Sequence, residues 1–147
     1  YREFFEQEIA PQIDGKQIQY LGEVTHEQKV ELLSKASLTL FPIIWPEPFG
    51  LVMLESMCVG TPVIATNFGA VPEVVADKRT GIICANPEDM DALIPEALKL
   101  SREECRKYVE ETFSVPKMVD GYEAAYQKVL EQHKSANGIT SAPVSAV

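Results

Sequence analysis

LTLFPIIWPEPFGLVMLESMCVGTPVIAT, residues 38–66, reads in turn as a strand, a helix and a second strand. Leu38 to Phe41 form a continuous apolar run of strand length, which indicates a strand buried on both faces. Phe49 to Val59 predict a helix that ends at Gly60, and Val63 to Thr66 predict the second strand. Two strands joined through a helix are typical of a parallel sheet.

The neighbouring segments continue this alternation. Upstream, Gln17 to Leu21 read as a short strand, and Thr25 with Gln28 forms a capping box for a helix that reaches Ala36. Downstream, the sequence predicts a helix through Pro72 to about Asp77 and a strand at 82–84 after a turn at Gly81. A helix starting at 86–89 follows, which Pro95 kinks or splits. The last two predicted helices run from a Ser101/Glu104 capping box to about Thr112 and onward from Ser114. We therefore expect an α/β fold with a doubly wound parallel sheet.

Two loops follow the carboxyl ends of the expected strands, Ile43 to Phe49 and Asn67 to Ala70. Ligands of doubly wound sheets bind outside the carboxyl ends of the strands. We expect both loops at the same edge of the sheet, beside a ligand.

Composition limits the classes of function. The 147 residues, 46% of them hydrophobic, suffice for one soluble globular domain. The net charge of -9 opposes binding to nucleic acid or to an anionic membrane surface, and no apolar run is long enough to span a membrane. Cys58, Cys84 and Cys105 form no disulfide or zinc pattern, so we expect a reducing, cytoplasmic location. The first residue is Tyr1 and not Met, which is expected of part of a longer protein.

Two carboxylates, Glu47 and Glu55, bracket the start of the predicted helix. Phe49, Gly50 and Leu51 would leave backbone N–H groups unpaired at the positive end of that helix, where an anion such as a phosphate binds. A carboxylate repels a phosphate but accepts strong hydrogen bonds from hydroxyl groups. The arrangement therefore predicts a phosphorylated sugar as ligand.

Simpler interpretations stay open. Glu55 could lie on the solvated face of its helix, although the many apolar residues around it favour a polar cleft. Glu47 could serve only the helix dipole, a gain of roughly 0.3–1 kcal/mol. Trp45 and Phe49 could stack on a base or a sugar, or could pack in the core.

The order of the motifs resembles one known family. E-P-F-G-L-V-x-x-E at 47–55 is followed by M-C-V-G-T-P-V-I-A-T at 57–66, G-A-V-P-E-V-V at 69–75 and F-S-x-x-K-M-V-x-x-Y from Phe113. This series resembles the carboxy-terminal half of retaining glycosyltransferases of the GT4 type, which have the GT-B architecture. The resemblance runs from about Tyr20 to Leu130, and it implies a Rossmann-like sheet and a nucleotide-sugar donor.

The resemblance also implies roles for single residues. Glu55 would hold the ribose hydroxyls of the donor, and Glu47 would contact the donor sugar near the reacting carbon as the catalytic residue. The implied backbone contacts are those of Phe49, Gly50 and Leu51 with sugar and diphosphate, of Gly22, Glu23 and Val24 with the nucleobase, and of Gly69 and Ala70 with the donor pocket. Neither a metal nor a cofactor is implied.

The chain departs from that pattern at its start. Family members have two further strands and a basic pair before the segment matching Tyr20, and an amino-terminal domain that binds the acceptor. We expect an incomplete carboxy-terminal half of a GT-B protein, inactive alone, with a partial donor domain at 1–132 and a flexible tail at 133–147. The segment Gln17 to Leu21 would then pack irregularly, pair with another chain or lie beside Leu38 to Phe41.

The resulting functional hypothesis is retaining transfer of sugar from a UDP- or GDP-sugar to an unknown acceptor. The alternative is a non-catalytic nucleotide-sugar-binding or interaction module with the same fold. A dinucleotide oxidoreductase is disfavoured, because no G-x-G-x-x-G follows a strand.

Overall fold

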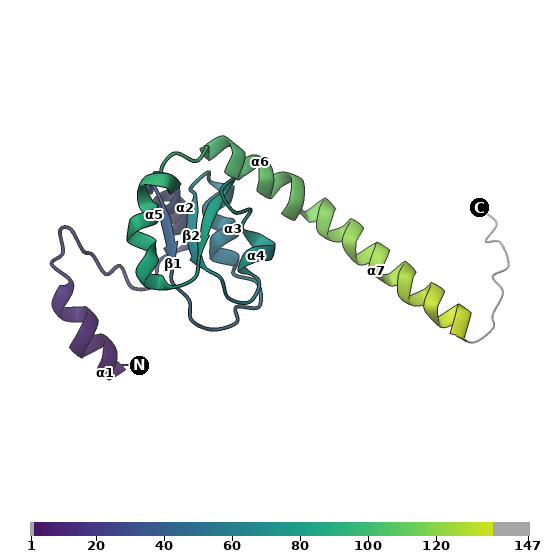
Figure 1. Ribbon diagram of the computed structural model, residues 1–147, viewed down its shortest axis with the longest axis horizontal. Coiled ribbons are helices and arrows are strands. Elements are labelled where there is room, and N and C mark those ends of the chain that lie inside the picture. The colour runs from purple at the N-terminus through teal and green to yellow at the C-terminus, as the bar shows by residue number, and fades with distance from the viewer. Residues whose placement is uncertain (1, 137–147) are drawn as a thin grey trace.

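The computed structural model describes residues 2–136 and has a parallel sheet of three strands at its centre (Figure 1). The strands are β1 (Thr39–Phe41), β2 (Val63–Thr66) and β3 (Gly81–Cys84), in the order β1-β2-β3. Thr39 pairs with Val63, which pairs with Gly81 on the other side. The predicted α/β fold with a parallel sheet is confirmed.

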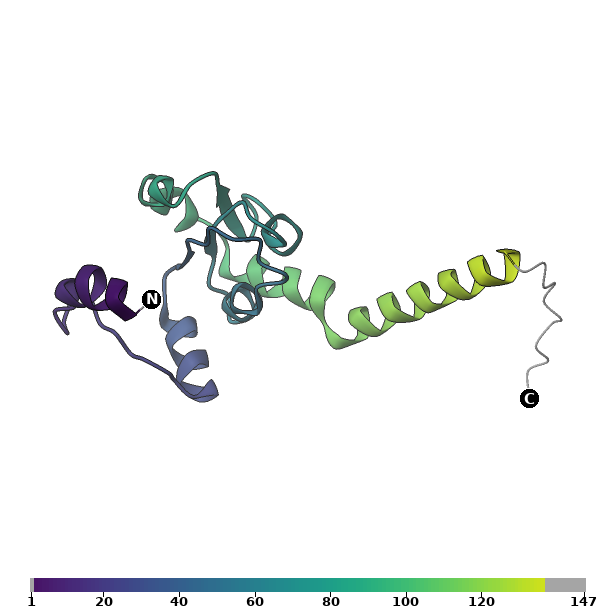
Figure 2. The same ribbon diagram turned by 90° about the horizontal axis from the view of Figure 1, so that it is seen from below.

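Helices precede, connect and follow the strands. They are α1 (Arg2–Phe4), the π-helix η1 (Phe5–Ile9), the 3-10 helix η2 (Ala10–Gln12), α2 (His26–Lys35), α3 (Leu51–Cys58), α4 (Val71–Val74), the 3-10 helix η3 (Pro87–Asp89), α5 (Met90–Ala97), α6 (Arg102–Phe113) and α7 (Val115–Ala136). Figures 1 and 2 show α5 on one face of the sheet and α3 with α4 on the other. This is the doubly wound arrangement.

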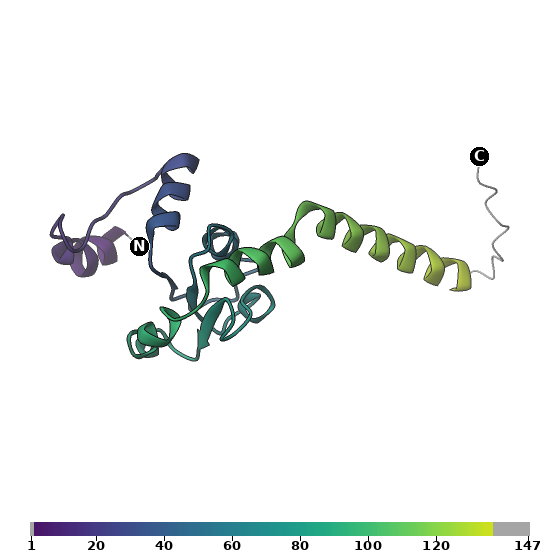
Figure 3. The same cartoon turned by 90° about the horizontal axis from the view of Figure 1, so that it is seen from above.

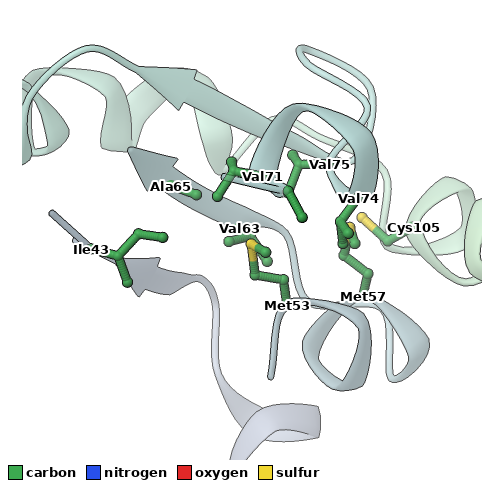
Figure 4. Close-up of a cluster of buried hydrophobic side chains, with 10 residues drawn as sticks. Ile43, Met53, Met57, Val63, Ala65, Val71, Val74, Val75 and Cys105 are labelled. Carbon is green, nitrogen blue, oxygen red and sulfur yellow. The ribbon is translucent and has the colours of Figure 1, made fainter. Parts of the chain in front are cut away.

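Successive side chains of β2 point to opposite faces of the sheet, and each face has its own core cluster. Val63 and Ala65 point toward α3 and α4, whereas Ile64 points toward α5. Figure 4 shows Met53 and Met57 of α3 reaching the same side of the sheet as Val63. All four residues of β2 are buried, as expected for a central strand.

The helix caps follow the sequence closely. Thr25 accepts a hydrogen bond from the backbone N–H of Gln28, whose side chain accepts the N–H of Thr25, so the predicted capping box of α2 is confirmed. Ser101 likewise accepts the N–H of Glu104. The carboxylate of Glu104, however, pairs with Arg79 at 3.1 Å, so only half of the second predicted box forms.

The strand predicted at Gln17 to Leu21 is wrong. Asp14 Oδ1 accepts the backbone N–H groups of Lys16, Gln17 and Ile18 at 2.8, 2.8 and 2.9 Å, and these amides are therefore occupied within a local turn. These hydrogen bonds lower the pKa of the Asp14 carboxyl, and the bond from Ile18 has the largest effect. The segment lies exposed outside the sheet in Figure 2.

Burial of β1 on both faces is also wrong. Within the described residues β1 pairs with β2 alone, so it forms an edge of the sheet, and the side chain of Leu40 is 48% exposed. Gly81 does not make a turn but opens β3. A Cβ there would lie 2.3 Å from the carbonyl oxygen of Val63, so only glycine permits this strand pairing.

Two helix predictions need correction. The helix through Pro72 ends at Val74 and not near Asp77, because the next amides close a turn in which the N–H of Ala76 bonds Thr80 Oγ1 at 3.1 Å. Pro95 does not split α5, since the carbonyl that loses its donor belongs to Asp91 in the exposed first turn.

The last helix, α7, extends away from the layered body, on the side opposite to α1 (Figures 1–3). The predicted apolar side of this helix is exposed and comprises Met118, Tyr122, Tyr126, Val129 and Leu130. The helix continues to Ala136, past the start of the tail expected at 133–147, of which 137–147 fall outside the described residues. None of the helices within 2–136 has the length and apolarity that crossing a membrane requires.

Candidate functional site

Two loops meet at the carboxyl edge of the sheet, as their positions after β1 and β2 predict. The backbone N–H of Ala70 donates to the carbonyl oxygen of Glu47 at 2.8 Å. Gly69 adopts a φ of 56°, and a Cβ there would lie 2.2 Å from the oxygen and 2.4 Å from the nitrogen of Glu47. The loop after β2 therefore packs directly against the backbone of Glu47.

The beginning of the first loop is fixed by Thr66, the last residue of β2. Its buried hydroxyl donates to the carbonyl oxygen of Ile43, and the Ile43 side chain is buried in the core (Figure 4). The sequence analysis did not single out Thr66. The available signal was a threonine that ends the apolar run Val63 to Ala65, because a buried hydroxyl needs a hydrogen-bond partner.

The carboxylate of Glu47 is half-buried and has a partner in its own loop. The indole Nε1–H of Trp45 donates to Glu47 Oε2 at 3.3 Å. Trp45 is 54% exposed, so it lies neither in the core nor fully in solvent. The structure thus gives Trp45 a polar contact that neither sequence interpretation anticipated.

Helix α3 begins at Leu51, two residues later than predicted. Gly50 is the N-cap residue with a φ of 79°, and a Cβ there would lie 2.4 Å from Cε of Met53. No side chain within residues 2–136 caps this helix end. The N–H of Met53 donates to the carbonyl oxygen of Gly50 at 3.0 Å, whereas those of Leu51 and Val52 retain the capacity to bind an anion.

Phe49 and Leu51 lie at this helix start with exposed side chains. The ring of Phe49 packs edge-on against Phe113 at 6.3 Å between centroids, which joins the loop to the end of α6. This contact favours packing as the role of the Phe49 ring.

Glu55 lies in the second turn of α3 and faces α2. Its Oε1 forms an ion pair with Lys29 Nζ at 2.5 Å, and each of the two side chains is about one-third exposed. Both line a cavity of about 440 Å³ between α2, α3 and α6, and the apolar members of its wall are Val30, Leu33, Leu54, Val59, Val109 and Phe113. Glu55 therefore faces a cavity, but one with mainly apolar walls.

Of the three residues predicted beside a nucleobase, Glu23 and Val24 line a different cavity, whereas Gly22 is exposed and is not part of its wall. Glu23 and Val24, with Leu21, face α2 across a space of about 420 Å³. Neither this cavity nor that of Glu55 includes Glu47 in its wall. The structure brings Glu47, Gly50, Gly69 and Ala70 together, and it places Glu55 with Lys29 in a separate cavity.

Other reactive groups lie outside this arrangement. Burial raises the pKa of the Cys84 and Cys105 thiols, which disfavours their thiolate forms. Within the described part of the chain, no three His, Cys, Asp or Glu side chains lie close enough to hold a metal ion.

The chain is similar in sequence to known proteins. The family model described as glycosyl transferases group 1 matches residues 2–114. An N-acetyl-alpha-D-glucosaminyl L-malate synthase from Bacillus anthracis is 34% identical over 79% of the chain and 32% of its own length. A glycogen synthase from Mycobacterium tuberculosis is 38% identical over 50% of the chain and 17% of its own length.

A solved structure shares the fold. The sucrose-phosphate synthase from Thermosynechococcus elongatus superposes with a TM-score of 0.70 at 24% identity, over 89% of the chain and 35% of that protein. The match places the present chain in the GT-B architecture. The chain thus spans about one-third of the length of this structure and of the Bacillus relative.

Proposed function

The chain belongs to the glycosyl transferases group 1 family, and we propose that it supplies part of the donor site of a retaining, GT4-type glycosyltransferase that uses a UDP- or GDP-sugar. The observation that carries this proposal is the packing of the Glu47 loop against Gly69 and Ala70, next to the uncapped start of α3. That geometry places a carboxylate and free amides on one edge of the sheet. A sugar diphosphate requires both.

We assign Glu47 to the donor sugar near the reacting carbon. As the bond from that carbon to the diphosphate breaks, negative charge grows on the departing phosphate oxygens. The N–H groups at the start of α3, beginning with Leu51, would stabilise this charge without rearrangement. Glu47 would stabilise the positive charge that develops on the sugar.

Glu55 is assigned to the ribose hydroxyls of the nucleotide. Lys29 contacts Oε1, and we assign the hydroxyl contacts to Oε2. The ion pair with Lys29 would hold the carboxylate in place, so that its second oxygen faces the hydroxyls.

We assign the rest of the donor site, and an amino-terminal domain that binds the acceptor, to parts of the protein outside this sequence. This proposal follows from the share of its relatives that the chain spans, about one-third. We also assign the protein to the cytoplasm, because the free Cys58, Cys84 and Cys105 suit a reducing compartment.

Calorimetry on the chain with UDP, GDP and one hexose conjugate of each tests donor binding. We expect one nucleotide to bind, and Glu55→Ala to weaken its binding by about 10-fold or more, the value of a hydrogen bond to a charged group. Glu110→Ala, at an exposed position on α6, is the matched control and should bind as the parent chain does. Equal affinity in both variants would reject the role of Glu55.

Sugar transfer by the full-length protein then separates an enzyme from a binding module. Glu47→Ala should reduce kcat, while nucleotide binding should change little. Binding of the donor without any transfer to acceptors would favour the non-catalytic alternative.

A further inference from the structure

We propose that Gly69 and Trp45 are positioning residues that hold Glu47 in its working orientation, one through the backbone and the other through the carboxylate. This inference rests on the proposed role of Glu47 at the donor sugar. It gives Gly69 a task that differs from the ligand contact implied by family resemblance. It also gives the exposed Trp45 a function.

The backbone of Glu47 is held from one side by the loop after β2. A Cβ on Gly69 would lie 2.2 Å from the oxygen and 2.4 Å from the nitrogen of Glu47, and 2.8 Å from the carbonyl carbon of Pro46. All three are backbone atoms, which cannot move aside as the end of a side chain can. Any residue larger than glycine at 69 must therefore displace the Glu47 peptide.

This holding loop is itself fixed to the sheet. The N–H of Asn67 donates to the carbonyl of Cys84 on β3 at 2.9 Å, and the N–H of Ala70 bonds the Glu47 carbonyl at 2.8 Å. The anchoring extends from β3, through the loop, to the peptide of Glu47. A shift at Gly69 is therefore transmitted to Glu47 and not absorbed by the loop.

Trp45 fixes the other end of Glu47. The indole has one N–H donor, and it meets Oε2 at 3.3 Å. The bond orients the carboxylate through Oε2, and we assign Oε1 to the donor sugar. Because Glu47 is only half-buried, packing alone does not set the rotamer of its side chain.

The sequence offers a direct reporter of this contact. Trp45 is the only tryptophan, so the tryptophan emission of the chain, excited selectively over its five tyrosines, arises from the indole that meets Glu47. Glu47→Ala and Gly69→Ala should each change the emission intensity or its maximum. Glu55→Ala should leave the emission unchanged, because Glu55 contacts Lys29 in another cavity. Emission identical to that of the parent chain in both Glu47→Ala and Gly69→Ala would overturn the proposal.

Kinetics of the full-length transferase give the second test. Trp45→Phe keeps an aromatic ring but removes the N–H, and Gly69→Ala displaces the Glu47 peptide. Each should lower kcat by about 10- to 100-fold with little change in the donor KM, as for a misplaced catalytic group. Gly15→Ala is the matched control for Gly69→Ala, since Gly15 also has a positive φ, 69°, but has no atom within 4 Å of an added Cβ.

A double-mutant cycle shows whether both residues act through Glu47. In the Glu47→Ala background, neither Trp45→Phe nor Gly69→Ala should reduce kcat further. Full additive losses would contradict the positioning role, as would parent-like kinetics of both single variants. If Gly69→Ala fails to fold, Trp45→Phe, which leaves the backbone unchanged, still decides the test. Unchanged transfer in Glu47→Ala would instead reject the proposed function itself.

Discussion

Individual residues at the loop edge are defined by backbone geometry as much as by their side chains. Gly50 and Gly69 both adopt positive φ angles, 79° and 56°. A Cβ would meet backbone atoms of Glu47 at Gly69 and the end of the Met53 side chain at Gly50. Each lies within contact distance of Glu47 or of α3, whose start we assign to the diphosphate. The choice of glycine at these positions therefore shapes the candidate site without contributing a functional group.

Gly50→Ala should destabilise the fold. The new Cβ would lie 2.4 Å from Cε of the fully buried Met53, in a backbone conformation that disfavours alanine. We expect a loss of about 1–3 kcal/mol in the free energy of unfolding, measured by urea denaturation. Gly121→Ala, with open space around its Cβ, is the control and should be neutral or slightly stabilising. Equal urea midpoints for the two variants would contradict the assigned strain.

Among the elements, those with local determinants followed from the sequence. The Thr25 capping box located α2, and the apolar run after Pro62 located β2 to the residue, because neighbouring side chains and buried runs determine both. The same reasoning placed both loops at one sheet edge.

Features that depend on residues far apart in the chain could not be predicted from the sequence. The apolar pattern of Leu38 to Phe41 indicated a buried strand, but burial depends on what pairs with each side of a strand. The packing of Gly69 on the Glu47 peptide depends on the relative position of two loops, which no local pattern encodes. The contact of Trp45 with Glu47 lies within one loop, but it depends on the backbone path of that loop. The separation of Glu55 from Glu47 likewise depends on how α2 packs against α3.

Arg102, the first residue of α6, joins three elements. Its guanidinium donates to the carbonyls of Ala36 and Ser34 at 2.8 and 2.6 Å, and to Thr61 Oγ1 at 3.0 Å. Arg102→Lys should lose about 1.5–3 kcal/mol of stability, because an ammonium group cannot reproduce this fork of donors. Thermal denaturation measures the loss. Arg2→Lys is the control, because Arg2 pairs with Glu6 at the surface, where the two side chains are 91% and 58% exposed. It should change the free energy of unfolding by no more than about 0.5 kcal/mol.

The turn at Asp14 should depend on pH. Its folded-state pKa is lowered, so its stabilising effect is fully present above the ordinary value of 3.8 and is lost as pH falls through the lower folded value. Acidification below 3.8 should therefore shift the amide NMR signals of Lys16, Gln17 and Ile18. The amide of Ala36, bonded to backbone carbonyls, is the control. Asp14→Asn should abolish the dependence, and persistence of the shifts in that variant would assign them to another group.

At the scale of the whole molecule, the buried core is confined to the middle of the chain. The two core clusters lie within residues 38–109, around the sheet, whereas α1 and α7 extend away from it (Figure 3). The family match ends at residue 114, immediately before α7 begins at Val115. The fold of the body and the candidate site therefore depend on the residues before α7.

Removal of residues 115–147 tests this division. Because Val115, Met118 and Tyr122 are exposed, the truncation deletes little buried apolar surface, and we expect the free energy of unfolding of the body to change by less than about 1 kcal/mol. The ring contacts of Phe113 with Phe49 and Tyr108 are retained. Urea denaturation followed by circular dichroism, together with calorimetry of nucleotide binding, measures the effect. Loss of cooperative unfolding in the truncated chain would show that α7 stabilises the body, and the exposed side of α7 would then have to contact it in solution.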